Sequence, residues 1–192
     1  MSGVGMGKTA AVAFTVILLI LGSTYAAAWF VAALLDLPSW SWSSPVVGAF
    51  GWASVVTGAA VGGWVFWYRN PANMISSTYV TFRKMFGRVP VAERSGRNER
   101  LVIEGPQRYT RNPLYFAVLL FVFGWGLATA STTLLVWSAV LLAWFALVLI
   151  PFEEEELRAL FGELYAAYAE RVPMLAPFSR HRRPRFSGQG RA

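Results

Sequence analysis

Two short polar segments hold the side chains that are best suited to chemistry, and each borders a long apolar run. Residues 101–115 read LVIEGPQRYTRNPLY, and residues 153–156 are four consecutive glutamates. Proline fixes φ and disfavours a helix at the residue before it, so the two prolines of the first segment predict a stiff loop that presents Gln107 and Arg111. Donors on one segment and carboxylates on the other could together bind a small molecule that carries both signs of charge.

The composition is that of an integral membrane protein. Of 192 residues, 56% are hydrophobic and 16% are aromatic, and the mean hydropathy is +0.46. The chain has no cysteine and one histidine. Disulfides, thiolate metal ligands and a cysteine nucleophile are therefore excluded, and a zinc or di-iron site lacks a ligand set. The net charge of +7 lies in blocks between apolar runs, which favours a bilayer over nucleic acid as the partner.

The apolar runs predict an all-α integral membrane protein that forms a single domain over residues 1–192. An apolar helix needs about 20 residues to cross a bilayer. Four segments are expected to be transmembrane helices: residues 10–35, 46–68, 114–128 and 132–150. The last two predict a tight antiparallel hairpin whose first arm is short for a full span. Pro151 is expected to kink or end the second arm.

Helical periodicity continues outside these spans. Residues 73–86 predict an interfacial amphipathic helix, and the residues after Pro151 predict a second amphipathic helix with a stripe of apolar and aromatic side chains. Gly58 and Gly62 offer a small-residue face for close packing against another helix.

Lysine and arginine are unevenly distributed among the loops. Residues 36–45 and 129–131 contain none, whereas residues 69–111 and the end of the chain hold nearly all of them. Because basic loops stay on the cytoplasmic side, we expect both termini and both polar segments to face the cytoplasm. The arginine-rich residues 180–192 are expected to be disordered and to contact anionic lipid headgroups.

The wording of the two polar segments is specific. Residues 105–115 follow the pattern G-P-x-x-Y-x-R-N-P-x-Y. A helical hairpin comes next, and then Glu153-Glu154, Leu157, Phe161-Gly162, Tyr165, Tyr168 and Val172-Pro173. In this order the segments resemble the isoprenylcysteine carboxyl methyltransferase-like family, which is related to the phospholipid N-methyltransferases. The resemblance covers residues 101–177.

The resemblance implies a methyltransferase that uses S-adenosylmethionine and binds it between residues 101–115 and 151–177. The implied cofactor-binding residues are Leu101, Val102, Gly105, Gln107, Asn112, Pro113, Tyr115, Glu153 and Glu154. Arg111 and Glu153 are the implied catalytic residues, with Arg111 as an orienting donor or an anion clamp. Of the four glutamates, only one or two can face inward from a helix, and Glu153 is the expected one. A solvated acidic helix end with a Glu154–Arg158 pair is the alternative.

This chain departs from the family in two places. The family often has tyrosine at the position of Gln107 and histidine at that of Asn112. Asparagine does not titrate near neutral pH, so Asn112 cannot be a general base. The eukaryotic prenylcysteine enzymes also carry arginines just before the acidic cluster, where this chain has residues 147–149, Leu-Val-Leu. A carboxylate substrate would lack its expected partner there.

The expected function is methyl transfer from S-adenosylmethionine to a membrane-embedded or apolar acceptor at the cytoplasmic face. The acceptor is left open between a prenylcysteine carboxylate, a phospholipid amine and a thiol. Two other classes also stay open: an NADPH-dependent membrane reductase and a non-catalytic membrane scaffold. No metal and no nucleic acid are expected as partners.

Overall fold

The computed structural model describes Thr15, Leu19, residues 22–23, 25–37 and 44–69, and the continuous stretch 101–176. Within these residues the chain is helical and has no strand. The elements are a short helix at Tyr25–Leu34, α2 (Pro45–Tyr68), the 3-10 turn η2 (Gly105–Arg108), α4 (Pro113–Ala128), α5 (Thr132–Trp144), the π-helical turn η3 (Phe145–Leu149) and α6 (Ile150–Arg171). The helix predicted at residues 73–86 and the tail at 180–192 lie outside the described residues.

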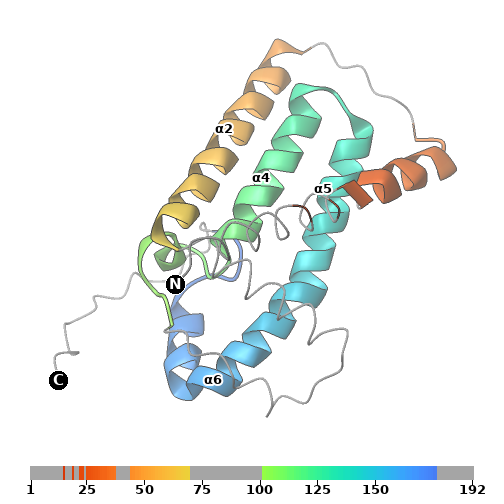
Figure 1. Cartoon of the computed structure of the whole chain (residues 1–192). Helices are drawn as coiled ribbons and strands as arrows, with labels where there is room; N and C mark the ends of the chain where they lie inside the picture. Colours follow the sequence, from red (N-terminus) through yellow and green to blue (C-terminus); the bar gives the residue numbers. More distant parts are fainter. Residues whose placement is uncertain are drawn as a thin grey trace, which may run out of the picture.

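Helices α2 and α4 lie side by side and pack closely (Figure 1). A Cβ added at Gly58 would lie 2.8 Å from the carbonyl oxygen of Ala117, so only a glycine allows the two backbones to come this near. Gly51 and Gly124 make similar close approaches nearer the α4–α5 turn. The predicted small-residue face is confirmed at Gly58, whereas a Cβ at Gly62 would make an ordinary contact of 3.8 Å.

The hairpin of α4 and α5 has nearly the predicted bounds, but the helix that forms its second half does not end at Pro151. The chain stays helical through η3 and α6. In η3 the Ile150 N–H donates to the Phe145 carbonyl, one residue further back than in an α-helix. A proline ring normally clashes with the carbonyl four residues earlier, and a wider π turn just before it relieves that clash. A kink or an end was expected at Pro151, and the helix does not end there but at Arg171.

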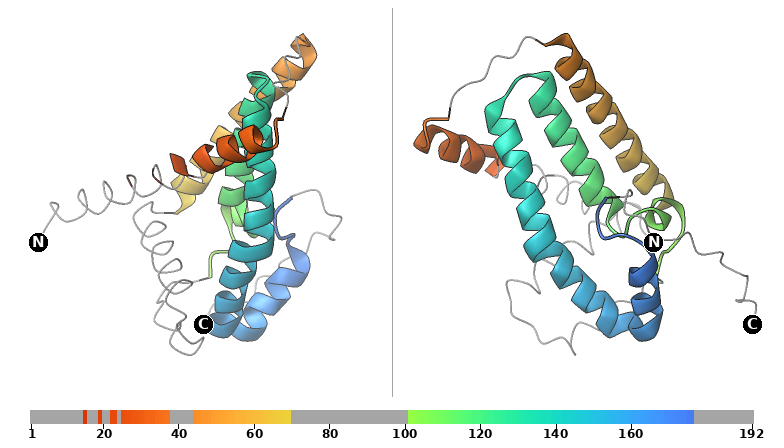
Figure 2. Two further views of the ribbon diagram at one scale, coloured as in Figure 1. Left: turned by 90° about the vertical axis from the view of Figure 1, so that its right-hand side faces the viewer. Right: turned by 180° about the vertical axis from the view of Figure 1, so that it is seen from behind.

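The sharp change of direction in α6 occurs at Gly162 instead. Its φ of 50° and ψ of −126° are non-helical, in a region that glycine adopts and other residues rarely do. The residues after it fold back, and the right view in Figure 2 shows the end of α6 returning toward the base of α4. We call residues 150–161 the first arm of α6 and residues 163–171 its second arm.

The helices suggest a membrane protein. Among the residues that the structure describes, two helices are long and apolar enough to cross a bilayer, Pro45–Tyr68 and Thr132–Arg171, whereas Pro113–Ala128 and Tyr25–Leu34 are apolar but shorter. The helix Tyr25–Leu34 lies across α5 (Figure 2), where Tyr25 meets Trp137 edge-on with ring centroids 5.7 Å apart. Large apolar side chains face outward on α2, and Trp67 is 88% exposed. An exposed apolar surface of this kind suits lipid contact.

Candidate functional site

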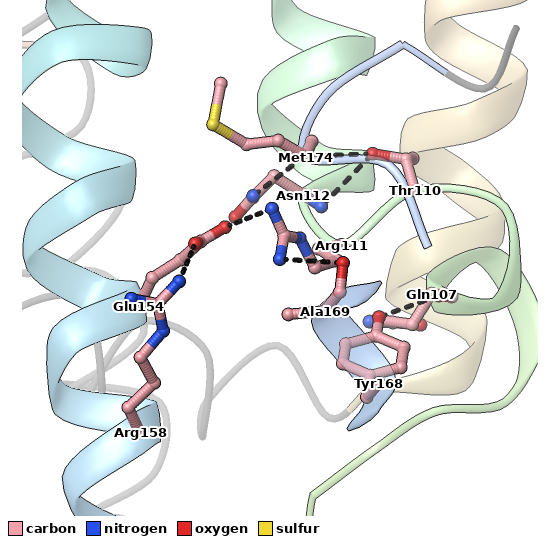
Figure 3. Close-up of polar contacts among 9 residues, drawn as sticks. All are labelled: Gln107, Thr110, Arg111, Asn112, Glu154, Arg158, Tyr168, Ala169 and Met174. Atoms are coloured by element: carbon pink, nitrogen blue, oxygen red, sulfur yellow. Dashed lines mark hydrogen bonds and ion pairs between the residues drawn. The ribbon is translucent and has the colours of Figure 1, made fainter. Parts of the chain in front are cut away.

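Residues 110–112, which immediately precede α4, connect the loop to the segment that directly follows α6. The Thr110 hydroxyl donates to the Met174 carbonyl at 3.2 Å, and the Asn112 side-chain amide donates to the same oxygen at 2.9 Å. The Asn112 backbone N–H donates in turn to the Thr110 hydroxyl at 3.2 Å. We call residues 110–112 and the carbonyls that they contact the clasp (Figure 3). Segments more than sixty residues apart are thereby held together.

Arg111 contributes the charged part of the clasp. Its backbone N–H donates to the Pro173 carbonyl at 2.9 Å, and its Nη1 donates to the Ala169 carbonyl at 3.3 Å. Its Nη2 lies 2.9 Å from Oε1 of Glu154, although the pair lacks the alignment of a hydrogen bond. The predicted Glu154–Arg158 pair also forms, at 3.7 Å, but the Arg158 side chain is 62% exposed. Arg111 is therefore the main counter-charge of Glu154.

Tyr115 links the polar loop to the apolar hairpin. Its hydroxyl donates to Oε1 of Glu153 at 2.9 Å. Its ring packs against Phe145 with centroids 4.7 Å apart, so the tyrosine spans the boundary between the glutamates and the buried α4–α5 interface. The resemblance implied cofactor contacts for both Tyr115 and Glu153, one from each polar segment, and these two residues are in direct contact.

The second arm of α6 covers the loop with an aromatic cluster. Tyr165, Tyr168 and Val172 are buried and pack with Leu101 and Ile103. The Gly162 corner makes this possible, because it turns one face of the second arm back onto the start of the loop. The apolar stripe predicted after Pro151 therefore contacts protein at these positions.

The two tyrosines of this cluster stay neutral. Burial raises the pKa of Tyr165 above its ordinary value, and the nearby Glu154 carboxylate raises it further. Burial likewise raises the pKa of Tyr168, with a smaller contribution from Tyr165. Tyr168 uses its proton, donating its hydroxyl to the Gln107 backbone carbonyl at 2.8 Å. A neutral phenol remains a donor over the physiological pH range.

Gln107 has a buried hydrogen-bond acceptor that a ligand could use. Its side chain is 5% exposed, and its Oε1 has no hydrogen-bond partner. A buried acceptor without a donor costs about 1–3 kcal/mol, which a ligand N–H group would recover. S-adenosylmethionine has such donors in its amino groups, and it has positive charge to meet the carboxylates of Glu153 and Glu154. The residues present therefore fit this cofactor.

The structure places the other predicted residues around the same loop. Gly105 has a φ of 61°, and a Cβ there would lie 2.7 Å from the Tyr68 ring of α2. Pro113 occupies the first turn of α4 and is buried, whereas Val102 is 37% exposed. Leu101 contributes to the aromatic cluster.

Two of the four glutamates are buried, within the one or two that helix geometry allowed, but neither of them is Glu153. Glu153 is half-buried, Glu154 is 9% exposed, Glu156 is fully buried and Glu155 is exposed. Thr110 and Met174 did not emerge from the sequence at all. Met174 contributes a backbone carbonyl, so its side-chain type carries no signal. Thr110 has a hydroxyl directly before the Arg-Asn-Pro turn, which was the one available indication.

Comparison with known proteins bears on this arrangement. Residues 92–164 match the phospholipid methyltransferase family. The chain is also 33% identical over 81 residues to protein-S-isoprenylcysteine O-methyltransferase B of Arabidopsis thaliana. The methyltransferase-family resemblance is confirmed. The match to the phospholipid methyltransferase family takes in the loop, the hairpin and the four glutamates.

The extent of these similarities is limited to part of each chain. The alignment covers 42% of this chain and 41% of the Arabidopsis protein, so the chain matches about two fifths of that relative's length. No solved structure matches the chain.

Proposed function

We propose that this protein transfers a methyl group from S-adenosylmethionine to a membrane-embedded or apolar acceptor. One observation carries the proposal: the Tyr115–Glu153 contact at 2.9 Å joins the two segments of the methyltransferase resemblance at the edge of an apolar hairpin. The clasp and the aromatic cluster add further contacts between the same two segments. Polar groups for a charged cofactor and an apolar surface for the acceptor are therefore adjacent.

The residues have distinct parts in this proposal. Glu153 and Glu154 supply negative charge for the cationic groups of the cofactor, and the Gln107 side chain supplies the buried acceptor that is free in this structure. Tyr115 orients Glu153, and Pro113 fixes the start of the helix that carries Tyr115. Leu101, Val102, Gly105 and Asn112 shape the loop around them. When it is bound, S-adenosylmethionine supplies a methyl group already activated on a sulfonium, so no strong protein base is needed for an amine, thiolate or carboxylate acceptor.

The remaining task of the protein is alignment. The acceptor heteroatom forms its bond to the methyl carbon as the carbon–sulfur bond breaks, which leaves S-adenosylhomocysteine. Holding both reactants in line and excluding water lowers the barrier without a metal or covalent intermediate. The exposed apolar residues 147–148 at η3 lie just before the glutamates and suit an acceptor that approaches from the bilayer.

Donor binding and methyl transfer test the proposal directly. Calorimetric titration of the purified chain in detergent with S-adenosylhomocysteine should give saturable binding. Glu153→Gln should weaken that binding by about 1.5–3 kcal/mol, because one charge-assisted contact is lost. Binding of NADPH instead would favour the reductase alternative, and binding of neither would favour the scaffold.

The acceptor can be identified in membranes that contain the protein and methyl-labelled S-adenosylmethionine. Label in a base-labile ester indicates a carboxylate, label retained in the phospholipid fraction indicates an amine, and volatile label indicates a thiol. Label found only in water-soluble metabolites would refute an apolar acceptor.

We further propose that the chain has four spans with both termini and the clasp on the cytoplasmic side. The support is the absence of Lys and Arg from residues 36–45 and 129–131. A cysteine introduced by Ser41→Cys should react with an impermeant reagent only from outside the cytoplasm. Reaction only from the cytoplasmic side would overturn this topology.

A further inference from the structure

Arg111 contacts both arms of the bent helix α6. Its Nη2 lies 2.9 Å from Glu154 on the first arm, and its Nη1 donates to the Ala169 carbonyl on the second arm at 3.3 Å. The corner at Gly162 lies between these two contacts in sequence. Figure 3 shows the guanidinium between the two arms, with one side toward each.

We propose that Arg111 is a positioning residue that braces the α6 corner and sets the separation of its two arms. The first arm carries Glu153 and Glu154, and the second carries the tyrosines that cover the loop. This separation would fix the width of the space between the carboxylates and the aromatic cluster. The inference rests on the proposed function only in naming the methyl donor as the molecule that occupies this space.

The chemistry of the guanidinium suits a brace. It is planar and rigid, and it presents donors on two edges, so a single side chain can reach two partners that face each other. Lysine has one compact ammonium on a flexible chain and cannot hold both contacts in a fixed geometry. Glycine at the corner adopts many backbone conformations, so Gly162 alone would leave the angle between the arms poorly defined.

A direct contact between Arg111 and the ligand is the rival role, because its Nε is buried and has no hydrogen-bond partner. The two roles predict different behaviour in the absence of any ligand. A brace holds the arms at a fixed separation in the empty protein. A ligand contact leaves that separation unchanged when Arg111 is replaced.

The separation of the arms can be measured because the chain has no cysteine of its own. Ala159→Cys on the first arm and Arg171→Cys on the second introduce two exposed positions for nitroxide labels. Electron paramagnetic resonance of the full chain in detergent, without ligand, should give a single narrow distance. Arg111→Met should broaden and lengthen that distance. The distance in Arg111→Lys should lie between those of the parent and of Arg111→Met. An unchanged distribution in Arg111→Met would overturn the inference.

A second variant guards against simple misfolding. Removal of Arg111 leaves the Glu154 carboxylate, which is 9% exposed, without its main counter-charge. The double variant Arg111→Met/Glu154→Gln removes that charge and should recover much of the melting temperature lost in Arg111→Met. Its label distance should stay broad, because the contact to Ala169 is still missing. A double variant that regains the narrow distance would contradict the brace.

Kinetics give a complementary result. If the arms set the donor space, Arg111→Met should raise KM for the methyl donor about tenfold or more, with a smaller change in kcat. An unchanged donor KM would contradict a positioning role in this site. If neither the parent nor any variant binds S-adenosylhomocysteine, the proposed function fails, while the label distances still decide whether Arg111 braces the corner.

Discussion

Removing the Tyr115 hydroxyl tests the link between the two halves of the site. Tyr115→Phe keeps the ring, which packs 4.7 Å from Phe145 between centroids, and deletes only the hydrogen bond of 2.9 Å to Glu153. A hydrogen bond to a charged group contributes about 1.5–3 kcal/mol net, and both side chains are part-buried, so the lower value applies. We therefore expect a loss of about 1.5 kcal/mol in donor affinity, which is roughly tenfold in Kd.

The assay is calorimetric titration with S-adenosylhomocysteine, with thermal unfolding measured in the same detergent. Tyr109→Phe is the matched control, because Tyr109 lies in the same loop, is 54% exposed and packs its ring near Trp64. The control should bind as the parent does. Equal affinity for the two phenylalanine variants, with both folded, would refute the idea that Tyr115 orients Glu153 for the cofactor.

Three further substitutions test the scaffold through the midpoint of thermal unfolding in detergent. Gly58→Val should cost about 1–3 kcal/mol by overpacking against the Ala117 carbonyl, whereas Gly63→Val should cost little, since no atom lies within 4 Å of its Cβ site. Tyr168→Phe should cost about 1–3 kcal/mol, because a buried carbonyl of η2 loses its donor. Gly162→Ala should cost about 1–3 kcal/mol through backbone strain alone, and a midpoint equal to that of the parent would show that the corner relaxes.

The helices that begin at a proline were predictable from the sequence. The helix predicted at residues 46–68 is observed at Pro45–Tyr68, and the helix predicted at 114–128 is observed at Pro113–Ala128. In both cases a proline stands in the first turn of the helix, where its missing N–H costs nothing. The proline and the apolar composition therefore predict the same start for the helix. The loop from Gly105 was likewise expected from its two prolines, although the short 3-10 turn within it was not.

The features that escaped prediction depend on tertiary contacts. Pro151 was expected to kink or end the helix, because the π turn that accommodates it has no sequence signature of its own. Gly162 read as part of a motif, and only the fold shows that it reverses α6. Glu154 and Glu156 are both buried, which simple helical periodicity did not anticipate for neighbours two residues apart. The pairing of Thr110 with Met174 depends on that reversal and could not be read before it.

The direction of the hydrogen bonds in the clasp has a consequence for how its sequence can vary. Three side chains on the loop donate, while the segment after the corner accepts through the backbone carbonyls of Ala169 and Met174. Every amino acid carries that carbonyl, so the accepting side tolerates side-chain exchange wherever the backbone path is kept. A library that randomises both sides and is selected for a closed clasp should retain Thr110, Arg111 and Asn112 and diversify at positions 169 and 174. Most of the specificity of this contact is thus encoded in one segment of the chain, residues 110–112.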